Sequence, residues 1–382
     1  MHGASDGAGD YANPLCAEWK CDDPASALHA IAQGDLSGFF RFQPAMGLTS
    51  LALRAPAVAL AHEGGAGIHG EYTAGAAVCL AGACALAVWL AWFMHRGGAR
   101  LVVVLSGLAL WVTAILAGRA LLFGHPEEPL AATLALAAIV MAWSGHPLAA
   151  GALIGLAIGT KEWALLVAPA VVFAGAAPDW RRIGAAALVA VALTTGVMAV
   201  GNPTSFKRAH EEQRAGDERT LSPATIWYRV GDKHVVSREG DQTLFTVYPP
   251  KLIGRWCRPF VMLLAVIAAL LFVRRRGFRS PDVFALAAFV LLARVVFDTQ
   301  TFSYHLVPML VLVTAWEAIG RRRLPVVGLA ATVAFLLTAY AVASSSDISS
   351  YGFNAIYLAW TLPLLAYLGY AAGAGSGAGA SP

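Results

Sequence analysis

The chain has 382 residues, of which 58% are hydrophobic and 13% are charged, and its formal net charge is +4. This composition excludes a water-soluble globular protein, in which about a quarter of the residues carry a charge. Apolar stretches of about 17 to 25 residues recur along the chain and match the thickness of a bilayer core. The sequence therefore predicts a membrane protein, and we expect membrane lipids and no nucleic acid among its partners.

Residues 1–71 form the first predicted region. They contain neither a signal peptide nor a stretch long enough to span a membrane, and we expect an extracytoplasmic first loop with interfacial helices. Asp23 followed by Pro24 predicts a helix start at residue 25, and residues 39–62 are typical of a helix lying on the membrane. An outward position for this loop requires a helix upstream of residue 1 or export without one, and we favour the upstream helix.

The apolar stretches after residue 71 predict an all-α fold, a polytopic transmembrane helical bundle of about 9 to 11 spans. They divide into an N-terminal transmembrane bundle at 72–201 and a C-terminal transmembrane bundle at 253–372. The strong predicted spans are residues 72–94, 101–122, 129–144, 183–201, 255–273, 281–297, 303–319, 325–343 and 353–372.

Basic residues set the expected orientation, because short cytoplasmic connections collect arginine and lysine. Placing four basic clusters inside leaves the connections 123–128, 202–252, 298–302 and 344–352 outside. The clusters are His95-Arg96 with Arg100, Arg181-Arg182, Arg274-Arg275-Arg276 with Arg279, and Arg321-Arg322-Arg323. We expect a multi-pass plasma-membrane protein whose active face is extracytoplasmic.

The segment 148–176 must then begin and end on the inner side. Its length of about 28 residues, at 1.5 Å a residue, is too short for two full crossings. We therefore expect a pair of short broken helices or a re-entrant hairpin, with Thr160-Lys161-Glu162 at the turn, pointing outward. The alternative, a single crossing, would place the Arg274 cluster outside.

Two polar regions complete the chain. Residues 202–252 are long and carry nearly balanced charge, which predicts an extracytoplasmic loop or lid with a small helical lobe. Residues 373–382 are rich in glycine, alanine and serine, which predicts a disordered tail.

The candidate functional residues are the polar groups expected on the outer membrane face. The segment GHPEEP at 124–129 places one imidazole and two carboxylates between apolar spans, where ionisable groups are costly unless they serve a function. We expect Lys161, Arg119 or His305 to hold a phosphate while a carboxylate deprotonates an acceptor hydroxyl. The full set is Asp22, Asp23, Arg119, His125, Glu127, Glu128, Lys161, Glu162, Asp298, Tyr304 and His305.

Structural roles are the alternative for each candidate. Asp23 is placed to cap a helix, and Glu127 and Glu128 to favour a first helical turn. The alternative for Lys161 and Glu162 is an ion pair with each other. The alternative for Asp298 and His305 is a position flanking a span at the interface. The pair Cys16 and Cys21 lacks a second set of ligands, so we predict no metal site and leave dependence on a divalent metal open.

These residues carry a family resemblance. An acidic first outer loop is followed by GHPEE at 124–128, GLAIGTKEWA at 155–164, Asp298, and YHLVP at 304–308. This pattern, over most of residues 22–320, resembles the multi-spanning type C glycosyltransferases, in particular the actinobacterial branch related to polyprenol-phosphate-mannose-dependent mannosyltransferases.

The resemblance implies transfer of a sugar from a polyprenyl-phosphate carrier to a lipid or glycan acceptor, usually with inversion. In that family an aspartate of the first outer loop is the general base, and Asp22-Asp23 match it; Glu128 is the further candidate base. The chain departs from the family by lacking the helix that precedes that loop. His125, Glu127, Arg119, Lys161, Glu162, Asp298, Tyr304 and His305 are the expected substrate-binding residues.

A nucleotide cofactor is not expected, because neither the phosphate-binding loop of NTPases nor the dinucleotide-binding glycine pattern is present. The main alternative function is a secondary transporter or lipid flippase, since broken helices with ions at their turn also mark carrier sites. That alternative predicts a second broken helix between residues 255 and 372, and no convincing counterpart of Thr160-Lys161-Glu162 is found there. A third reading is an inactive structural membrane subunit.

Overall fold

The computed structural model describes residues 24–44, 47–118, 125–217, 221–239, 242–342 and 349–373. Helices dominate this part of the chain, which confirms the predicted helical fold. The first half contains α1 (Ala25–Ala32), α2 (Leu36–Arg41), α3 (Leu48–Glu63), α4 (Ile68–Arg96), α5 (Leu101–Ala117), α6 (Glu127–Trp143), α7 (Pro147–Ile158), α8 (Ala168–Ala174), α9 (Trp180–Val191) and α10 (Val197–Gly201). The second half contains α11 (Pro203–Asp217), β1 (Asp232–Glu239), β2 (Gln242–Tyr248), α12 (Lys251–Arg276), α13 (Val283–Phe297), α14 (Val307–Ala315), α15 (Val326–Leu336) and α16 (Ser350–Gly373).

Several of these helices are continued by tighter or wider turns. The π-helical segment Ala192–Gly196 joins α9 to α10, and similar segments extend α14 to Gly320 and α15 to Val342. The 3₁₀ helix Ser303–Leu306 precedes α14. Each strong span predicted from the sequence therefore coincides with a helix.

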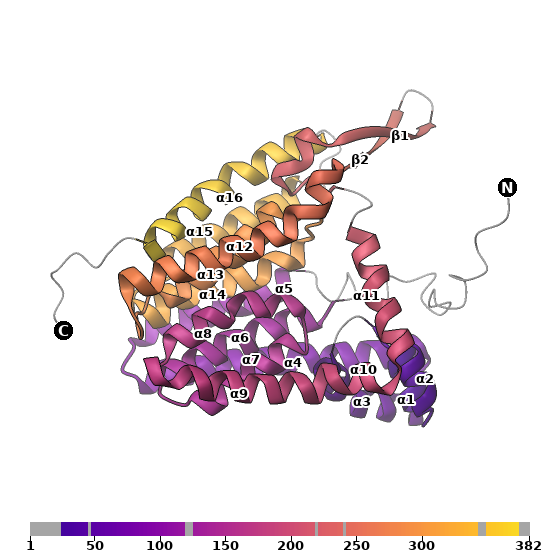
Figure 1. Ribbon diagram of the computed structural model, residues 1–382, viewed down its shortest axis with the longest axis horizontal. Coiled ribbons are helices and arrows are strands. Elements are labelled where there is room, and N and C mark those ends of the chain that lie inside the picture. The colour runs from indigo at the N-terminus through magenta and orange to yellow at the C-terminus, as the bar shows by residue number, and fades with distance from the viewer. Residues whose placement is uncertain are drawn as a thin grey trace.

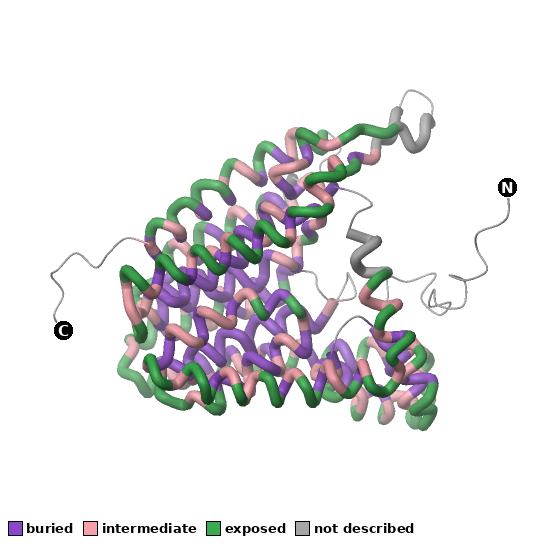
Figure 2. Tube along the Cα trace, viewed as in Figure 1, coloured by how far each residue is buried: buried purple, intermediate pink, exposed green. Residues whose placement is uncertain are grey.

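The bundle has a buried centre and an apolar outer surface. Helices α6, α13 and α14 are buried on nearly all sides, and α9, α12, α15 and α16 surround them (Figures 1 and 2). The surrounding helices expose large apolar side chains outward, for example Leu188 and Leu193 on α9 and Leu263 and Leu270 on α12. Apolar patches this extensive are rare on water-soluble monomers and suit contact with lipid.

Five described helices are long and apolar enough to cross a membrane. They are Ile68–Arg96, Ala177–Gly201, Lys251–Arg276, Ser303–Gly320 and Ser350–Gly373. Apolar helices of 10 to 17 residues account for further predicted spans, including α5, α13 and α15. The expected total of 9 to 11 spans is not confirmed by these lengths.

Two of the predicted inner basic clusters meet at one end of the bundle. Arg276, at the end of α12, pairs with Asp282 (Nη1 to Oδ2, 3.1 Å), and Arg321, after α14, pairs with the other oxygen of the same carboxylate. Arg275 and Arg276 also donate to the last carbonyls of α16. These clusters therefore lie on the same side, as the predicted orientation requires.

The segment 148–176 forms the predicted broken pair. Helix α7 ends at Ile158, a turn covers residues 159–161, and a 3₁₀ helix, Glu162–Val167, leads into α8. Trp143, just before α7, packs against Phe284 at the start of α13 (5.5 Å between ring centroids). The amide of Arg279 donates to the carbonyl of Phe173 in α8 (2.8 Å). The pair thus starts and finishes near the first turn of α13, with Lys161 at its tip.

A stripe of glycines allows α7 to approach α9 closely. Gly151, Gly155 and Gly159 lie four residues apart on one helical face, and each faces α9 or its continuation. A β-carbon added at Gly155 would lie 2.6 Å from the β-carbon of Ala190 and 2.7 Å from the Ala187 carbonyl oxygen. The stripe fixes the position of α7 and so the position of its tip.

Gly155→Ala is therefore expected to destabilise the protein by about 1–3 kcal/mol, the usual cost of overpacking a filled contact. Gly184→Ala on α9 is the matched control, because its added β-carbon meets no atom within 4 Å and alanine favours helices. Thermal unfolding of both variants in the same detergent measures the difference. Equal melting temperatures for the two variants would contradict close α7–α9 packing.

The N-terminal helices α1, α2 and α3 form a small unit of their own beside the bundle (Figure 1). Leu28, Phe39, Leu51 and Val58 form its buried core together with Met198 of α10. Helices are thus present where interfacial helices were expected, although residues 42–47 separate α2 from α3.

Asp35 caps helix α2. Its Oδ1 accepts hydrogen bonds from the Gly38 amide and the Ser37 hydroxyl, each at 2.8 Å, and the bond from Gly38 is the main reason that the pKa of this carboxyl is lowered. Because the pKa is lowered, the cap stabilises the folded chain at pH values above 3.8, the ordinary pKa of an aspartate. This stabilisation is lost as the pH falls through the lower pKa of the folded state. The Gly38 amide chemical shift is expected to titrate below pH 3.8; a midpoint at or above that value would contradict the cap.

The region 202–252 differs from its prediction. It contains the helix α11, and in addition β1 and β2 form an antiparallel hairpin, in which Asp232 pairs with Tyr248 and Glu239 with Gln242, that the prediction did not include. Valine and threonine recur in this stretch on either side of Gly240-Asp241, which favours strands over a helix. The hairpin projects from the end of the bundle (Figure 1).

The chain before the hairpin is anchored to the bundle. The Trp227 indole donates to the carbonyl of Phe297 (2.7 Å), and the Ser222 hydroxyl donates to the carbonyl of Thr301 (2.8 Å). Residues 221–230 therefore cover the connection between α13 and α14, close to the start of the Ser303–Leu306 turn.

Candidate functional site

A buried ionic network joins the start of α6 to the tip of the broken pair. The Lys161 ammonium lies 2.7 Å from Glu127 Oε1 and 3.8 Å from Glu128 Oε1. His125 Nδ1 lies 3.1 Å from the same Glu127 oxygen. The Trp163 indole donates to Glu128 Oε2 at 2.8 Å. We call His125, Glu127, Glu128, Lys161 and Trp163 the polar centre.

The local sequence explains why both glutamates point into the bundle. Pro126 precedes α6 with helical backbone angles, so Glu127 and Glu128 occupy the first turn, where the helix dipole favours negative charge. Both side chains are buried, at 0% and 1% exposure. Glu127 Oε2 has no hydrogen-bond partner among the described residues. A buried carboxylate oxygen left in this way is costly and is typical of a site with a task beyond packing.

The backbone at the tip of the broken pair delivers Lys161 to these carboxylates. Lys161 itself is extended, with φ −145° and ψ 126°, so α7 ends before it and the 3₁₀ helix begins after it. Gly159 packs against the Thr194 side chain of the α9–α10 helix, and a β-carbon there would clash with it. The position of the ammonium group therefore depends on the glycine stripe.

Aromatic side chains extend the polar centre toward α14. The ring of Tyr304 lies 4.6 Å from that of His125 and 4.5 Å from that of His305. Both Tyr304 and His305 come from the short 3₁₀ helix ahead of α14, and His305 Nδ1 accepts from the Phe302 amide (3.3 Å). The three rings form a continuous edge beside Glu127.

The charges around this edge are predominantly positive. Arg294 of α13 lies over the Trp163 ring (6.0 Å to the centroid), and the charges of Arg294, Lys161 and Arg258 all act on the His305 imidazole. Arg54 of α3 is buried and its charge acts on Glu127. Lys161 lies beside both carboxylates, the charge of Arg54 acts on Glu127, and that of Arg294 acts on Tyr304 and His305. This positive charge suits an additional anionic group such as a phosphate.

The structure brings together six of the residues expected to act together. They are His125, Glu127, Glu128, Lys161, Tyr304 and His305. The alternative pairing of Lys161 with Glu162 is not seen, since Glu162 is exposed and Lys161 contacts Glu127 instead.

The remaining candidates lie elsewhere or outside the description. Asp298, at the end of α13, accepts from the Thr299 amide (2.7 Å), and its charge acts on Cys257. Asp22, Asp23 and Arg119 lie outside the described residues. Their expected roles stay predictions.

Three residues of the site were missed by sequence reasoning: Arg54, Trp163 and Arg294. A signal was available for Arg294, because it is the one charged residue in the apolar span 281–297 besides Asp282. Trp163 gave no such signal, since a tryptophan beside a helix break is usually packing.

Comparisons with protein-family models, with curated proteins and with solved structures find no match for this chain.

Proposed function

We propose that the chain is an integral membrane glycosyltransferase that moves a sugar from a polyprenyl-phosphate carrier to a lipid or glycan acceptor. The sugar is mannose or another hexose or pentose. The polar centre carries this proposal, because it combines a buried carboxylate with surplus cations inside an apolar bundle. A lipid-linked sugar phosphate presents the matching chemistry, an anionic group at the junction of a polar sugar and an apolar chain.

The reaction requires one bond exchange. The acceptor oxygen forms a bond to the sugar C1 while the bond from C1 to the phosphate oxygen breaks, and the polyprenyl phosphate leaves with the electron pair. The acceptor hydroxyl loses its proton to a carboxylate. No nucleotide takes part, and the proposal requires no resident cofactor.

The contacts divide the work between the two glutamates. Glu127 is held by Lys161 at 2.7 Å and by His125 at 3.1 Å, so its role is to fix the ammonium group. Glu128 Oε1 has only the longer contact of 3.8 Å to the Lys161 ammonium, and Glu128 Oε2 accepts the hydrogen bond that orients the side chain, from the Trp163 indole. Glu128 is therefore the base that we favour among the described residues, and Asp22 and Asp23 stay candidates through the resemblance.

Cations beside the aromatic edge are placed to receive the phosphate. Lys161 and Arg294 supply permanent charge, and in the 3₁₀ helix ahead of α14 Tyr304 supplies a hydroxyl group and His305 ring nitrogens. Such groups stabilise the charge that develops on a leaving phosphate. Arg119 is expected to assist from the adjoining connection.

A plasma-membrane location with the polar centre facing outward is part of the proposal. Residues 303–320 form one continuous helical stretch with Tyr304 at its start and Arg321 directly after its end. Its 18 residues extend about 27 Å at 1.5 Å a residue. The polar centre and the paired basic clusters are thus at opposite ends of the bundle, and an inner position for the basic end places the polar centre outside.

A secondary transporter or lipid flippase is the second candidate. The observation that favours it is the hairpin of half-length helices, α7 and α8, whose tip carries an ion-paired lysine. Carriers bind substrates at such interrupted helices. No second interrupted pair occurs among the described helices after residue 250, and carriers commonly use two.

Transfer of radiolabelled mannose from polyprenyl-phosphate-mannose tests the proposal. Membranes that contain the chain are compared with membranes that lack it. A transferase moves the label to a new lipid or glycan product, whereas a carrier moves the intact donor across the membrane. Donor translocation without a labelled product would support the transporter and overturn the transferase.

A further inference from the structure

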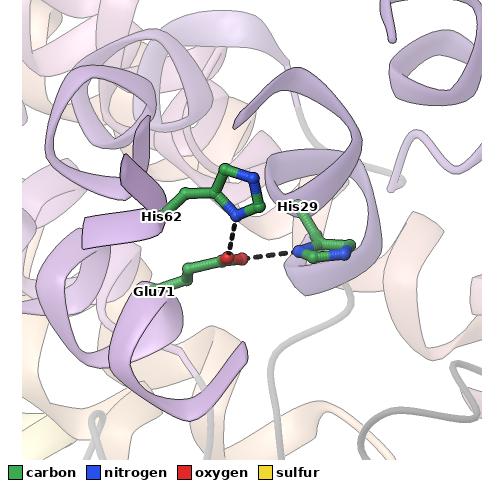
Figure 3. A group of neighbouring side chains, drawn as sticks. All are labelled: His29, His62 and Glu71. Carbon is green, nitrogen blue, oxygen red and sulfur yellow. Dashed lines mark hydrogen bonds and ion pairs between the residues drawn. The ribbon is translucent and has the colours of Figure 1, made fainter. Parts of the chain in front are cut away.

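A second buried carboxylate lies away from the polar centre, between the N-terminal helices. Glu71, in the first turn of α4, faces His29 of α1 and His62 of α3 (Figure 3). His29 Nδ1 lies 2.7 Å from Glu71 Oε2, and His62 Nδ1 lies 2.7 Å from Oε1. The two imidazoles therefore share one carboxylate through their δ nitrogens.

We propose that His29, His62 and Glu71 bind one divalent first-row transition metal ion, for which zinc is the probe. Two imidazoles and one carboxylate form a known donor set for zinc, with a fourth position left to water. This site lies outside the proposed transferase chemistry and does not depend on it.

The distances fit such an ion after a small adjustment. The three donor atoms lie within 4.8 Å of one another. Bonds of about 2.0–2.2 Å to a tetrahedral ion place donor atoms about 3.3 Å apart. The imidazole nitrogens, which contact different oxygens of Glu71, therefore have to move slightly away from the carboxylate and toward each other, which side-chain rotation supplies. Each neutral imidazole then carries its proton on Nε2 and gives the Nδ1 lone pair to the metal.

Burial is unequal in a way that suits an ion entering from one side. The Glu71 side chain is 4% exposed, whereas those of His29 and His62 are 24% and 35% exposed. The buried carboxylate gains a metal cation in place of two imidazole N–H donors, and the half-buried rings leave an approach from solvent. The His29 and His62 rings meet edge to face, 5.8 Å between centroids, so their nitrogens converge without stacking.

A neighbouring amide is placed to orient one of the ligands. The Gln33 side-chain nitrogen lies 3.0 Å from His29 Nε2. An amide can present its oxygen at the same position after a half-turn, and it then accepts the Nε2 proton of a metal-bound imidazole. Outer partners of this kind fix the ring orientation of histidine ligands.

The position of the site indicates what the metal does. Its ligands come from three helices that a metal would tie together at the start of α4, a helix long and apolar enough to span a membrane. Helix α3 also carries Arg54, whose charge acts on Glu127. The metal thus holds the N-terminal unit against the bundle and fixes the helix that supplies one cation to the polar centre.

Metal content of the purified full-length chain in detergent tests the proposal. We expect one zinc per chain by mass spectrometry after equilibration with zinc and removal of loose metal. Loss of one ligand in His29→Ala, His62→Ala or Glu71→Gln is expected to weaken binding at least about a hundredfold, since even outer partners account for 10–100-fold. His95→Ala, an exposed histidine at the far end of α4, is the matched control and should bind as the original chain does.

Two further controls keep the test decisive. The double variant Cys16→Ser/Cys21→Ser should retain the ion, which excludes zinc held by those thiols. Should Glu71→Gln fail to fold, cobalt absorption in the half-exposed His62→Ala variant replaces it: the original chain is expected to show visible bands of four-coordinate cobalt, and the variant to lack them. Absence of zinc and cobalt binding by the original chain, or undiminished binding by His62→Ala, would overturn the proposal.

Discussion

Lys161→Met is expected to destabilise the folded chain by about 3–5 kcal/mol, the usual cost of removing one partner from a buried ion pair. The ammonium group lies 2.7 Å from Glu127, a carboxylate with no exposed surface. Without it, Glu127 and Glu128 face each other's charge across a buried first turn. Thermal unfolding in detergent measures the loss.

Two companion variants separate this effect from general damage. The double variant Glu127→Gln/Lys161→Met removes both charges of the 2.7 Å pair and should recover much of the lost stability, because Glu128 then no longer faces a second buried charge. Lys207→Met breaks the exposed pair of Lys207 with Glu211, whose side chains are 77% and 64% exposed, and should cost under about 1 kcal/mol. Equal losses for Lys161→Met and Lys207→Met would contradict a buried ionic network.

Glu128→Gln is expected to lower the rate of sugar transfer by about 10²–10⁴-fold, the usual contribution of a positioned general base. The amide oxygen of glutamine can still accept the Trp163 indole proton, so the fold is expected to persist. Glu211→Gln is the matched control, because the Glu211 side chain on α11 is 64% exposed and is not part of the polar centre. Comparable rates for these two variants would remove Glu128 from the role of base and direct attention to Asp22 and Asp23.

Helix positions could be predicted because long apolar runs in a membrane protein have few alternatives. The predicted span 353–372 corresponds to Ser350–Gly373, and 255–273 to Lys251–Arg276. The break in the pair 148–176 was also predictable, since the basic clusters on either side require the segment to return to the side where it starts. Of the predicted span 101–122, α5 covers residues 101–117, and residues 119–122 lie outside the described structure.

Side-chain partners could not be predicted in the same way. Trp163 and Glu128 are 35 positions apart, and only the approach of α6 and the hairpin tip brings them together. Adjacency in sequence was misleading for Lys161 and Glu162, because consecutive residues point in different directions at a helix break. The hairpin of β1 and β2 was missed because the many charged residues of the region indicated a solvated loop.

The metal ligands show the same limit more strongly. Glu71 is 42 positions from His29 and 9 from His62, and no metal-binding motif has this spacing. These residues meet because α1, α3 and α4 pack around one helix start. Such a set is recognisable only after the packing is known.

The central claim is that the polar centre receives a polyprenyl-phosphate-linked sugar. An experimental structure of the chain in lipid with a non-hydrolysable polyprenyl-phosphonate sugar tests it most directly. Phosphonate density beside Lys161, Arg294 and His305, with the sugar next to Glu128, is the predicted result. Density at the opposite end of the bundle, near Arg276 and Arg321, or an empty polar centre at saturating analogue, would contradict the account.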